Sequence, residues 1–124
     1  NIISKVIDEA RRYGAAVVAV PVKATIKKVS SLHKAGQINL AVKQTLDRDN
    51  LWEIQTPQVF RKDIILKAYN RFKDKSVTDD ASLVERLGIR VKIIRGSYFN
   101  IKITTAEDLI LADTILTRKL NKFG

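Results

Sequence analysis

The sequence contains no cysteine and only one histidine, and both facts narrow the chemistry that it can perform. Without cysteine, neither a disulfide framework nor a thiolate metal site can form, and a reducing cytoplasm is compatible with the composition. The single histidine, His33, lies in a polar stretch with no cluster of carboxylates nearby. We interpret it as a loop residue and assign no metal ligand in the chain.

Long hydrophobic runs are also missing. The longest run, from Ala15 to Val20, is far too short to cross a bilayer. No targeting peptide, internal repeat, low-complexity stretch or linker is visible. With 124 residues, of which 45% are hydrophobic, the chain can form one compact core. We expect one domain, or part of one.

Acidic residues are outnumbered, since 13 Asp and Glu stand against 23 Lys and Arg and give a formal net charge of +10. Such an excess favours anionic partners such as phosphates, nucleic acid or acidic lipid. A small nucleic-acid-binding module would show clustered basic residues interleaved with exposed aromatic residues. Here the basic residues are dispersed and most aromatic residues fall in apolar patterns. We keep that module as the alternative from another class, and expect neither nucleic acid nor a membrane as partner.

The first part of the chain predicts a helix followed by a buried strand. Apolar residues recur at helical spacing from Ile2 to Ala10, and Gly14 can adopt the left-handed conformation that ends a helix. The unbroken apolar run from Ala15 to Val20 is typical of a strand that helices cover on both faces.

Residues 23–48 predict a long β-hairpin. Segments 25–29 and 38–46 show alternating apolar and polar residues, as half-exposed antiparallel strands do, and a polar turn from Ser30 to Gln37 separates them. A two-stranded hairpin is marginally stable alone in water. We therefore interpret it as a dimerisation arm.

The remaining pattern alternates strands and helices. A short strand from Leu51 to Ile54 is followed by a turn at Pro57, which removes a ladder donor, and a helix then runs from Arg61 to Phe72. Thr78 or Asp79 can cap a second helix, which Gly88 ends, and Val91 to Arg95 predicts a strand. The pattern as a whole predicts an α/β fold with a mostly parallel sheet and one antiparallel excursion.

The last helix has its own signals. Thr104 and Glu107 match a capping box. The helix that follows carries an apolar stripe that we expect to be buried, formed by Leu109, Ala112, Leu116 and Leu120.

Two longer motifs resemble one enzyme family. The run from Thr45 to Phe60 and the segment Asn100-Ile101-Lys102-Ile103-Thr104 are similar to segments of 2-C-methyl-D-erythritol 4-phosphate cytidylyltransferases. Residues 77–82 and 105–109 continue the resemblance in the family's order. The resemblance covers nearly the whole chain but only the C-terminal half or so of a family member. The glycine-rich loop that binds the CTP triphosphate in this family is absent, as is its His-Asp-Ala-Ala-Arg-Pro segment.

The resemblance implies an architecture. Residues 1–124 would form the C-terminal portion of a Rossmann-like nucleotidyltransferase domain, with a projecting β-hairpin dimerisation arm at about residues 23–48 and without the N-terminal CTP-binding part. Family members are homodimers of the cytoplasm, or of the plastid in a plant or alga.

The resemblance also implies an activity. The family transfers a cytidylyl group from CTP to 2-C-methyl-D-erythritol 4-phosphate, giving 4-diphosphocytidyl-2-C-methylerythritol and pyrophosphate in non-mevalonate isoprenoid biosynthesis. Its Mg²⁺ is held mainly by the triphosphate and by residues that this chain lacks. A ribitol 5-phosphate cytidylyltransferase is the alternative within the superfamily, although the run from Thr45 to Trp52 favours the methylerythritol enzyme. We expect the fragment alone to be inactive.

Two basic residues match catalytic positions of the family. Arg48 matches the arginine that reaches across the dimer to the methylerythritol phosphate of the partner subunit, and Lys102 matches the lysine that orients the same phosphate for attack. Arginine can clasp a phosphate through two hydrogen bonds, whereas lysine is a movable point charge. Without the resemblance, Arg48 would be interpreted as a solvated charge and Lys102 as the outward residue of a strand.

Three threonines match substrate-binding positions, and each has a structural alternative. Thr56 precedes Pro57, which alone favours an extended residue there, and Thr78 could serve only as a helix cap. Thr25 is the weakest match because Ala24 stands where relatives usually carry aspartate. The paired acids Asp79 and Asp80 are better explained as a helix start than as metal ligands.

Overall fold

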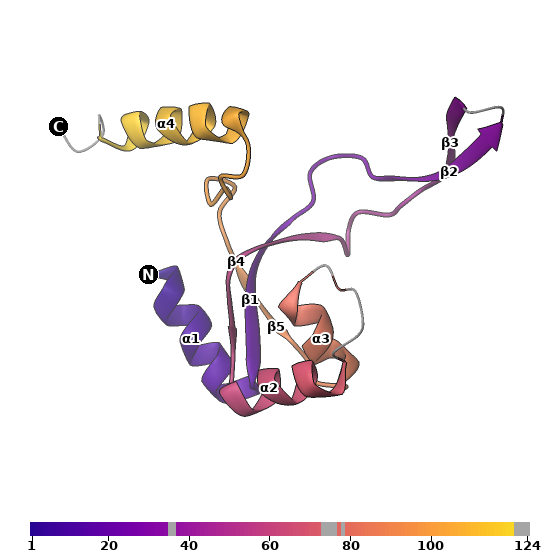
Figure 1. Cartoon of the computed structure of the whole chain (residues 1–124). Helices are drawn as coiled ribbons and strands as arrows, with labels where there is room; N and C mark the ends of the chain where they lie inside the picture. The colour runs from indigo at the N-terminus through magenta and orange to yellow at the C-terminus, as the bar shows by residue number, and fades with distance from the viewer. Residues whose placement is uncertain (35–36, 73–76, 78, 121–124) are drawn as a thin grey trace. The chain divides into compact units, whose positions relative to one another are not determined.

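The computed structural model describes all residues except 35–36, 73–76, 78 and 121–124. The chain divides into two compact units (Figure 1). Unit 1 comprises Asn1–Val20 and Ile54–Gly124, and unit 2 comprises Pro21–Glu53. Each is described by itself below. In the described part of the chain, no helix has the length and apolar character that crossing a membrane requires.

Helix α1 (Ile2–Tyr13) packs one face on the sheet of unit 1. At its start, the side chain of Asn1 accepts a hydrogen bond of 2.9 Å from the amide of Ile3. At its end, Gly14 adopts a left-handed conformation with φ 91° and donates to the carbonyl of Ala10. Val6 and Ala10 are buried. The predicted helix and its glycine stop are confirmed.

Strand β1 (Ala15–Pro21) is the central strand of a three-stranded sheet with the order β4-β1-β5. Ala16 and Val18 pack with α1, whereas Ala15 contributes to a second apolar cluster. Successive side chains of a strand point to opposite faces, so the two clusters lie on opposite sides of β1. All residues from Ala15 to Val20 are buried, which confirms the prediction of a strand covered on both faces.

The two neighbours of β1 run in opposite directions. Strand β5 (Lys92–Arg95) pairs with β1 in parallel, with Ala16 opposite Lys92. Strand β4 (Trp52–Phe60) runs antiparallel to β1, because Arg61 after β4 donates to Gly14 before β1, whereas Leu51 before β4 accepts from Val22 after β1. The sheet is therefore mixed, in an α/β fold.

The predicted turn at Pro57 is wrong, because β4 continues through a cis Thr56–Pro57 bond to Phe60. Among the described residues β4 is an outer strand of its sheet. A proline in an outer strand can lack its N–H on the side without a neighbour, and the ladder then loses no hydrogen bond.

Helices α2 (Lys62–Arg71) and α3 (Asp80–Arg86) cover the second face of β1. Ala68 of α2 and Leu83 and Val84 of α3 are buried together with Ala15. Gly88 follows α3 with a φ of 79°. Both helices and the strand after them lie where the sequence predicts them, within one or two residues.

Unit 2 contains an antiparallel hairpin of β2 (Lys27–Lys34) and β3 (Gln37–Thr45), paired from Lys27 opposite Thr45 onward. The predicted hairpin is confirmed, but its predicted turn, Ser30 to Gln37, is too long, since β2 continues to Lys34. Polar residues indicated a turn there. They are equally compatible with a two-stranded ribbon, which has no buried face to require apolar side chains.

Helix α4 (Ala106–Leu120) comes after β5 in unit 1. The prediction that its apolar stripe is buried is largely wrong. Ala112 is buried, but Leu109 and Leu116 are 61% and 60% exposed, and the side chain of Leu120 lies outside the described residues. Helical periodicity identifies an apolar stripe, but it does not identify the surface that would cover it.

Candidate functional site

The segment that carries Lys102 begins where β5 ends. The amide of Gly96 donates to the carbonyl of Ala19 and so extends the pairing with β1 by one bond of 2.8 Å. The chain then turns, because the amide of Asn100 donates to the carbonyl of Ser97 at 2.9 Å. Lys102 follows this turn by two residues.

Amide side chains tie this segment to β4. The side-chain nitrogen of Asn100 donates to the carbonyl of Thr56 at 2.6 Å and lies 3.4 Å from the side-chain oxygen of Gln55. Gln55 in turn donates to the carbonyl of Ser97 at 2.8 Å. These bonds bring the segments of two predicted site residues, Thr56 and Lys102, side by side in unit 1. Both side chains are exposed and so accessible to a substrate.

A second anchor follows Lys102 at the start of α4. The carboxylate of Asp108 accepts from the amide and the hydroxyl of Thr104, each at 3.0 Å, and from the amide of Thr105 at 2.9 Å. The hydroxyl oxygen of Thr105 in turn accepts a hydrogen bond of 3.2 Å from the amide of Asp108. The capping box is therefore Thr105 with Asp108, one residue beyond the predicted Thr104 with Glu107.

Those hydrogen bonds also set the charge of Asp108. Donation from the backbone and side chain of Thr104, followed by donation from Thr105, lowers the pKa of Asp108 from 3.8 to about 2. The carboxylate therefore stays ionised at all but strongly acidic pH, and a negative charge in the first helical turn interacts favourably with the helix dipole.

Strand β4 also contacts the start of α3. Gln58 donates to one carboxylate oxygen of Asp79 at 3.3 Å, and the other oxygen accepts from the amide of Ser82 at 3.0 Å. Asp79 therefore caps α3, as predicted. Thr78, the predicted substrate contact that precedes it, lies outside the described residues.

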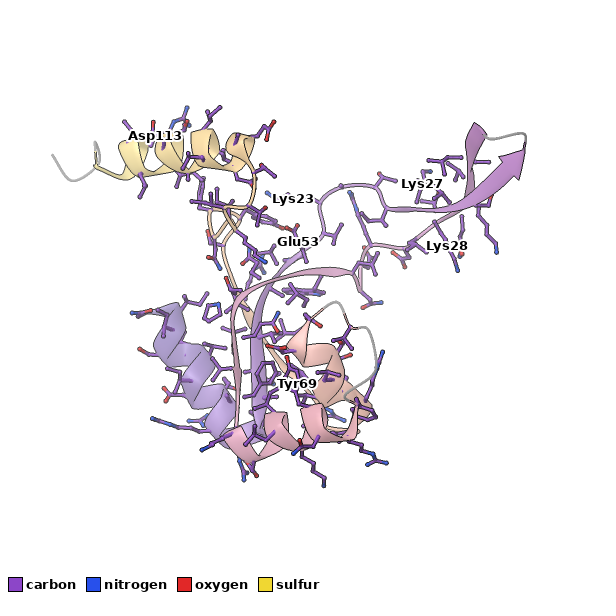
Figure 2. The ribbon with its side chains drawn as sticks, in the orientation of Figure 1. Lys23, Lys27, Lys28, Glu53, Tyr69 and Asp113 are labelled. Carbon is purple, nitrogen blue, oxygen red and sulfur yellow. The ribbon has the colours of Figure 1, made fainter. Side chains whose placement is uncertain are left out.

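The carboxylate of Asp80 accepts a hydrogen bond from a tyrosine. The side chain of Tyr69 on α2 points toward α3, where its hydroxyl donates to the carboxylate of Asp80 (Figure 2). This hydrogen bond, together with the negative charge of Asp80, raises the pKa of Tyr69 above its usual value of 10.0. Asp79 and Asp80 thus interact with other protein groups at the helix start.

The other two predicted site residues belong to unit 2, at the base of the hairpin. The guanidinium of Arg48 donates to the carbonyl of Lys23, and the carbonyl of Arg48 accepts from the amide of Leu51 at 3.0 Å. Thr25 is exposed in the segment that precedes β2, next to Ile26, whose carbonyl accepts from the amide of Leu46. Arg48 and Thr25 therefore share the hairpin base.

The residues that could hold a divalent metal are few. No group of three His, Asp or Glu side chains gathers within the described ranges. Asp79 accepts a hydrogen bond from Gln58 and Asp80 accepts one from Tyr69.

Sequence reasoning missed the amide side chains Gln55, Gln58 and Asn100. All three lie within the motifs that carry the family resemblance, whose predicted site residues are an arginine, a threonine and a lysine. The available signal was their chemistry, since three carboxamides in apolar strand and loop segments need hydrogen-bond partners if they are partly buried.

Comparison with known proteins identifies the family. The sequence model of the IspD family, 2-C-methyl-D-erythritol 4-phosphate cytidylyltransferase, matches residues 1–118. The chain belongs to this cytidylyltransferase family.

Relatives of known sequence and structure agree with the cytidylyltransferase assignment. The protein of this name from Alkaliphilus oremlandii is 52% identical over 118 residues, which cover 94% of this chain and 47% of the relative. For the protein from Geobacillus thermodenitrificans, the identity is 51% over 115 residues, with 91% and 47% covered. The solved structure of 4-diphosphocytidyl-2C-methyl-D-erythritol synthase from Anaerococcus prevotii matches with a TM-score of 0.78 and 35% identity, over 94% of this chain and 50% of that one.

The cytidylyltransferase comparisons confirm the resemblance and the α/β fold. The chain spans about half the length of the relatives that it matches. The role of the hairpin as a dimerisation arm stays a prediction.

Proposed function

We propose that this chain supplies the polyol-phosphate side of a cytidylyltransferase site. The reaction is transfer of the cytidylyl group of CTP to 2-C-methyl-D-erythritol 4-phosphate, with release of pyrophosphate. The observation that carries the proposal is the tethering of the Lys102 segment beside Thr56, in a chain that belongs to this family. It places an exposed ammonium group and an exposed hydroxyl on adjacent segments.

The chemistry fits those two groups. The attacking phosphate and the triphosphate bring crowded negative charge together, and the attacking oxygen has to be held in line with the α-phosphorus. Lys102 would supply positive charge to the attacking phosphate, and the hydroxyl of Thr56 would hydrogen-bond to the same substrate. Neither group takes a proton from the phosphate. Their contribution is position and electrostatic stabilisation.

Arg48 would complete the phosphate contacts from the partner subunit. Its guanidinium is a planar donor fork suited to a phosphate, and one nitrogen is already fixed by the carbonyl of Lys23. Thr25 at the same hairpin base, and Thr78 ahead of α3, are proposed as further substrate contacts.

CTP and Mg²⁺ are expected to bind chiefly through groups other than those described here. The described residues offer no carboxylate cluster, so the triphosphate would provide most of the Mg²⁺ ligands. When bound, the metal would neutralise charge on the triphosphate. A cytoplasmic location stays a prediction.

The hairpin is proposed to pair with a second copy. Val29 and Val42 stand opposite each other, and Leu40 lies two residues from Val42, so the three share one face. Their exposures are 51%, 61% and 65%. An apolar face on a hairpin that is marginally stable alone favours a covering partner, and a two-fold dimer would bring Arg48 to the neighbouring site.

A hybrid enzyme tests the function. Residues 1–118 of this chain replace the matching stretch of the Alkaliphilus oremlandii relative, and pyrophosphate release is measured with CTP, methylerythritol phosphate and Mg²⁺. We expect turnover within about tenfold of the unmodified relative, since the substituted half is 52% identical to it. Turnover with ribitol 5-phosphate in place of methylerythritol phosphate would reassign the substrate. A folded but inactive hybrid would overturn the proposal, and salt-sensitive binding of oligonucleotide would support the nucleic-acid alternative.

A further inference from the structure

The side chain of Asn100 forms hydrogen bonds within the protein, and the proposed substrate-binding roles of Lys102 and Thr56 do not explain them. Its side-chain nitrogen is 2.6 Å from the carbonyl oxygen of Thr56 and 3.4 Å from the side-chain oxygen of Gln55. Both atoms are acceptors and both belong to β4. Asn100 itself lies in the loop after β5, and is only partly exposed. It therefore joins the loop to a strand that is 44 residues away in the sequence.

The orientation of this amide pair is fixed by the backbone. A carbonyl oxygen can only accept a hydrogen bond, so the group of Asn100 that faces the Thr56 carbonyl must be the NH₂ group. By the same reasoning, the group of Gln55 that faces the Ser97 carbonyl at 2.8 Å is its NH₂ group. Gln55 then presents its oxygen to Asn100. The two side chains form a consistent network in which each backbone carbonyl selects one amide orientation.

Lys102 lies between this network and the cap of α4. It follows Asn100 by two residues and precedes Thr104, which Asp108 holds, by two residues. Two residues of extended chain span at most about 7 Å, so both anchors restrict the backbone position of Lys102. The lysine side chain keeps its own rotamers, but the point from which it extends is held on both sides.

We propose that Asn100 and Gln55 are positioning residues that set the location of the Lys102 ammonium relative to Thr56. The inference rests on the proposed function of Lys102 and deepens it. Neither amide contacts the phosphate, and both act through the loop backbone. A lysine is a flexible point charge and gains geometric precision only from its anchor, so a loop released from β4 would leave the charge present but misplaced.

The first test is a double-mutant cycle in the hybrid enzyme. Asn100→Ala should lower kcat/KM for methylerythritol phosphate, by up to about a hundredfold, and leave KM for CTP nearly unchanged. In a Lys102→Ala background the same change should have almost no further effect, within about twofold. If Asn100 merely stabilised the fold, its effect would be the same in both backgrounds, and that result would overturn the proposal.

Three further variants test whether the NH₂ group of Asn100 is the donor and whether the effect is specific to this network. Asn100→Asp has the same shape but presents a carboxylate to two acceptors, so it should not restore activity. Gln55→Ala should reproduce the pattern of Asn100→Ala more weakly. Asn70→Ala removes an exposed asparagine of α2 and should leave all parameters unchanged. Full activity of Asn100→Asp would contradict the assigned donor.

A second measurement separates this inference from the proposed function. Amide hydrogen exchange in the hybrid should become faster in Asn100→Ala at residue 100, whose amide donates to the carbonyl of Ser97, by about tenfold or more after correction for the intrinsic rate of the new side chain, whereas exchange at Val17 and Val18 of β1 should not change. This readout needs no activity. Inactivity of the parent hybrid would overturn the proposed function alone, and unchanged exchange at residue 100 would overturn the anchoring role of Asn100.

Discussion

At the scale of single residues, two cationic side chains are expected to bind the substrate phosphate, and each is held in place differently. Arg48 is anchored through its guanidinium to the carbonyl of Lys23, whereas Lys102 is anchored through its backbone neighbours. In the hybrid enzyme, Arg48→Ala and Lys102→Ala should each reduce kcat/KM for the polyol phosphate, at a cost of about 2.7–4 kcal/mol in transition-state stabilisation. Steady-state kinetics with that substrate below saturation measures the effect.

The controls for this pair are Lys67→Ala and Arg86→Ala, which remove exposed cations of α2 and α3. They should retain normal kinetics. Arg48→Lys keeps the charge but not the planar fork, and should recover only part of the loss. Near-normal turnover of either alanine variant at the proposed site residues would remove that residue from the site.

Glycine positions provide a second prediction at this scale. Gly14 and Gly88 both have positive φ, at 91° and 79°. A Cβ on Gly14 would lie 2.5 Å from the δ-carbon of Ile64, whereas a Cβ on Gly88 would meet nothing within 4 Å. The left-handed conformation alone costs a non-glycine residue about 1–2 kcal/mol, so Gly88→Ala should lower the free energy of unfolding by about that amount.

Gly14→Ala should cost more than Gly88→Ala, because the clash with Ile64 adds to the same backbone strain. Urea unfolding of the two variants, followed by circular dichroism, compares them directly. Equal destabilisation would show that Ile64 moves aside at little cost, and would contradict an added penalty from this clash.

At the scale of elements, the cap of α4 predicts a pH dependence. The folded pKa of Asp108 is about 2 and its ordinary value is 3.8. Because folding lowers this pKa, the cap stabilises the folded chain above about pH 3.8, and that stabilisation is lost as the pH falls through about 2. A carboxyl NMR titration should place the midpoint of Asp108 near pH 2. A midpoint of 3.8 or above would contradict the capping box.

The hairpin is the other element with a prediction of its own. Val42→Lys places a charge on the apolar face that Val29 and Leu40 share, and should shift the hybrid from dimer toward monomer in sedimentation velocity. Ala41→Lys introduces the same charge on the opposite face of the ribbon and should leave the dimer intact. A parent hybrid that is monomeric at high concentration would count against a dimerisation arm.

Local sequence signals predicted most elements but not the contacts between them. The buried run from Ala15 to Val20, the stop at Gly14 and the cap at Asp79 follow from short-range rules, and the structure confirms them. The turn expected at Pro57 is wrong because the rule for proline depends on whether the strand is outer or inner, which no local pattern records.

The site residues likewise divide into those that local motifs predict and those whose role depends on long-range contacts. Thr56 and Lys102 were predicted from motifs, whereas the role of Asn100 depends on a bond to a residue 44 positions away in the sequence. No periodicity or local propensity contains that information. The exposure of Leu109 and Leu116 on α4 has a similar cause, since a helical pattern shows an apolar face without showing its partner.

At the scale of the whole molecule, the described residues are proposed to supply one side of a two-substrate reaction. Lys102, Thr56 and Arg48 are suited to hold and orient a phosphate nucleophile, but they are not expected to bind the triphosphate as pyrophosphate leaves. The chain also spans only about half the length of its relatives. A site that orients the nucleophile without activating the leaving group lacks the larger part of the electrostatic stabilisation that catalysis requires.

We therefore expect the 124-residue polypeptide by itself to have no cytidylyltransferase activity, while the hybrid enzyme is active. The assay is pyrophosphate release from CTP and methylerythritol phosphate with Mg²⁺, with the hybrid as the positive control at equal concentration. Weak binding of methylerythritol phosphate remains compatible with inactivity, because a basic surface can attract a phosphate without CTP. Clear turnover by the pure polypeptide, surviving removal of any trace contaminant by a second purification, would show that the groups that bind and activate CTP lie among these 124 residues.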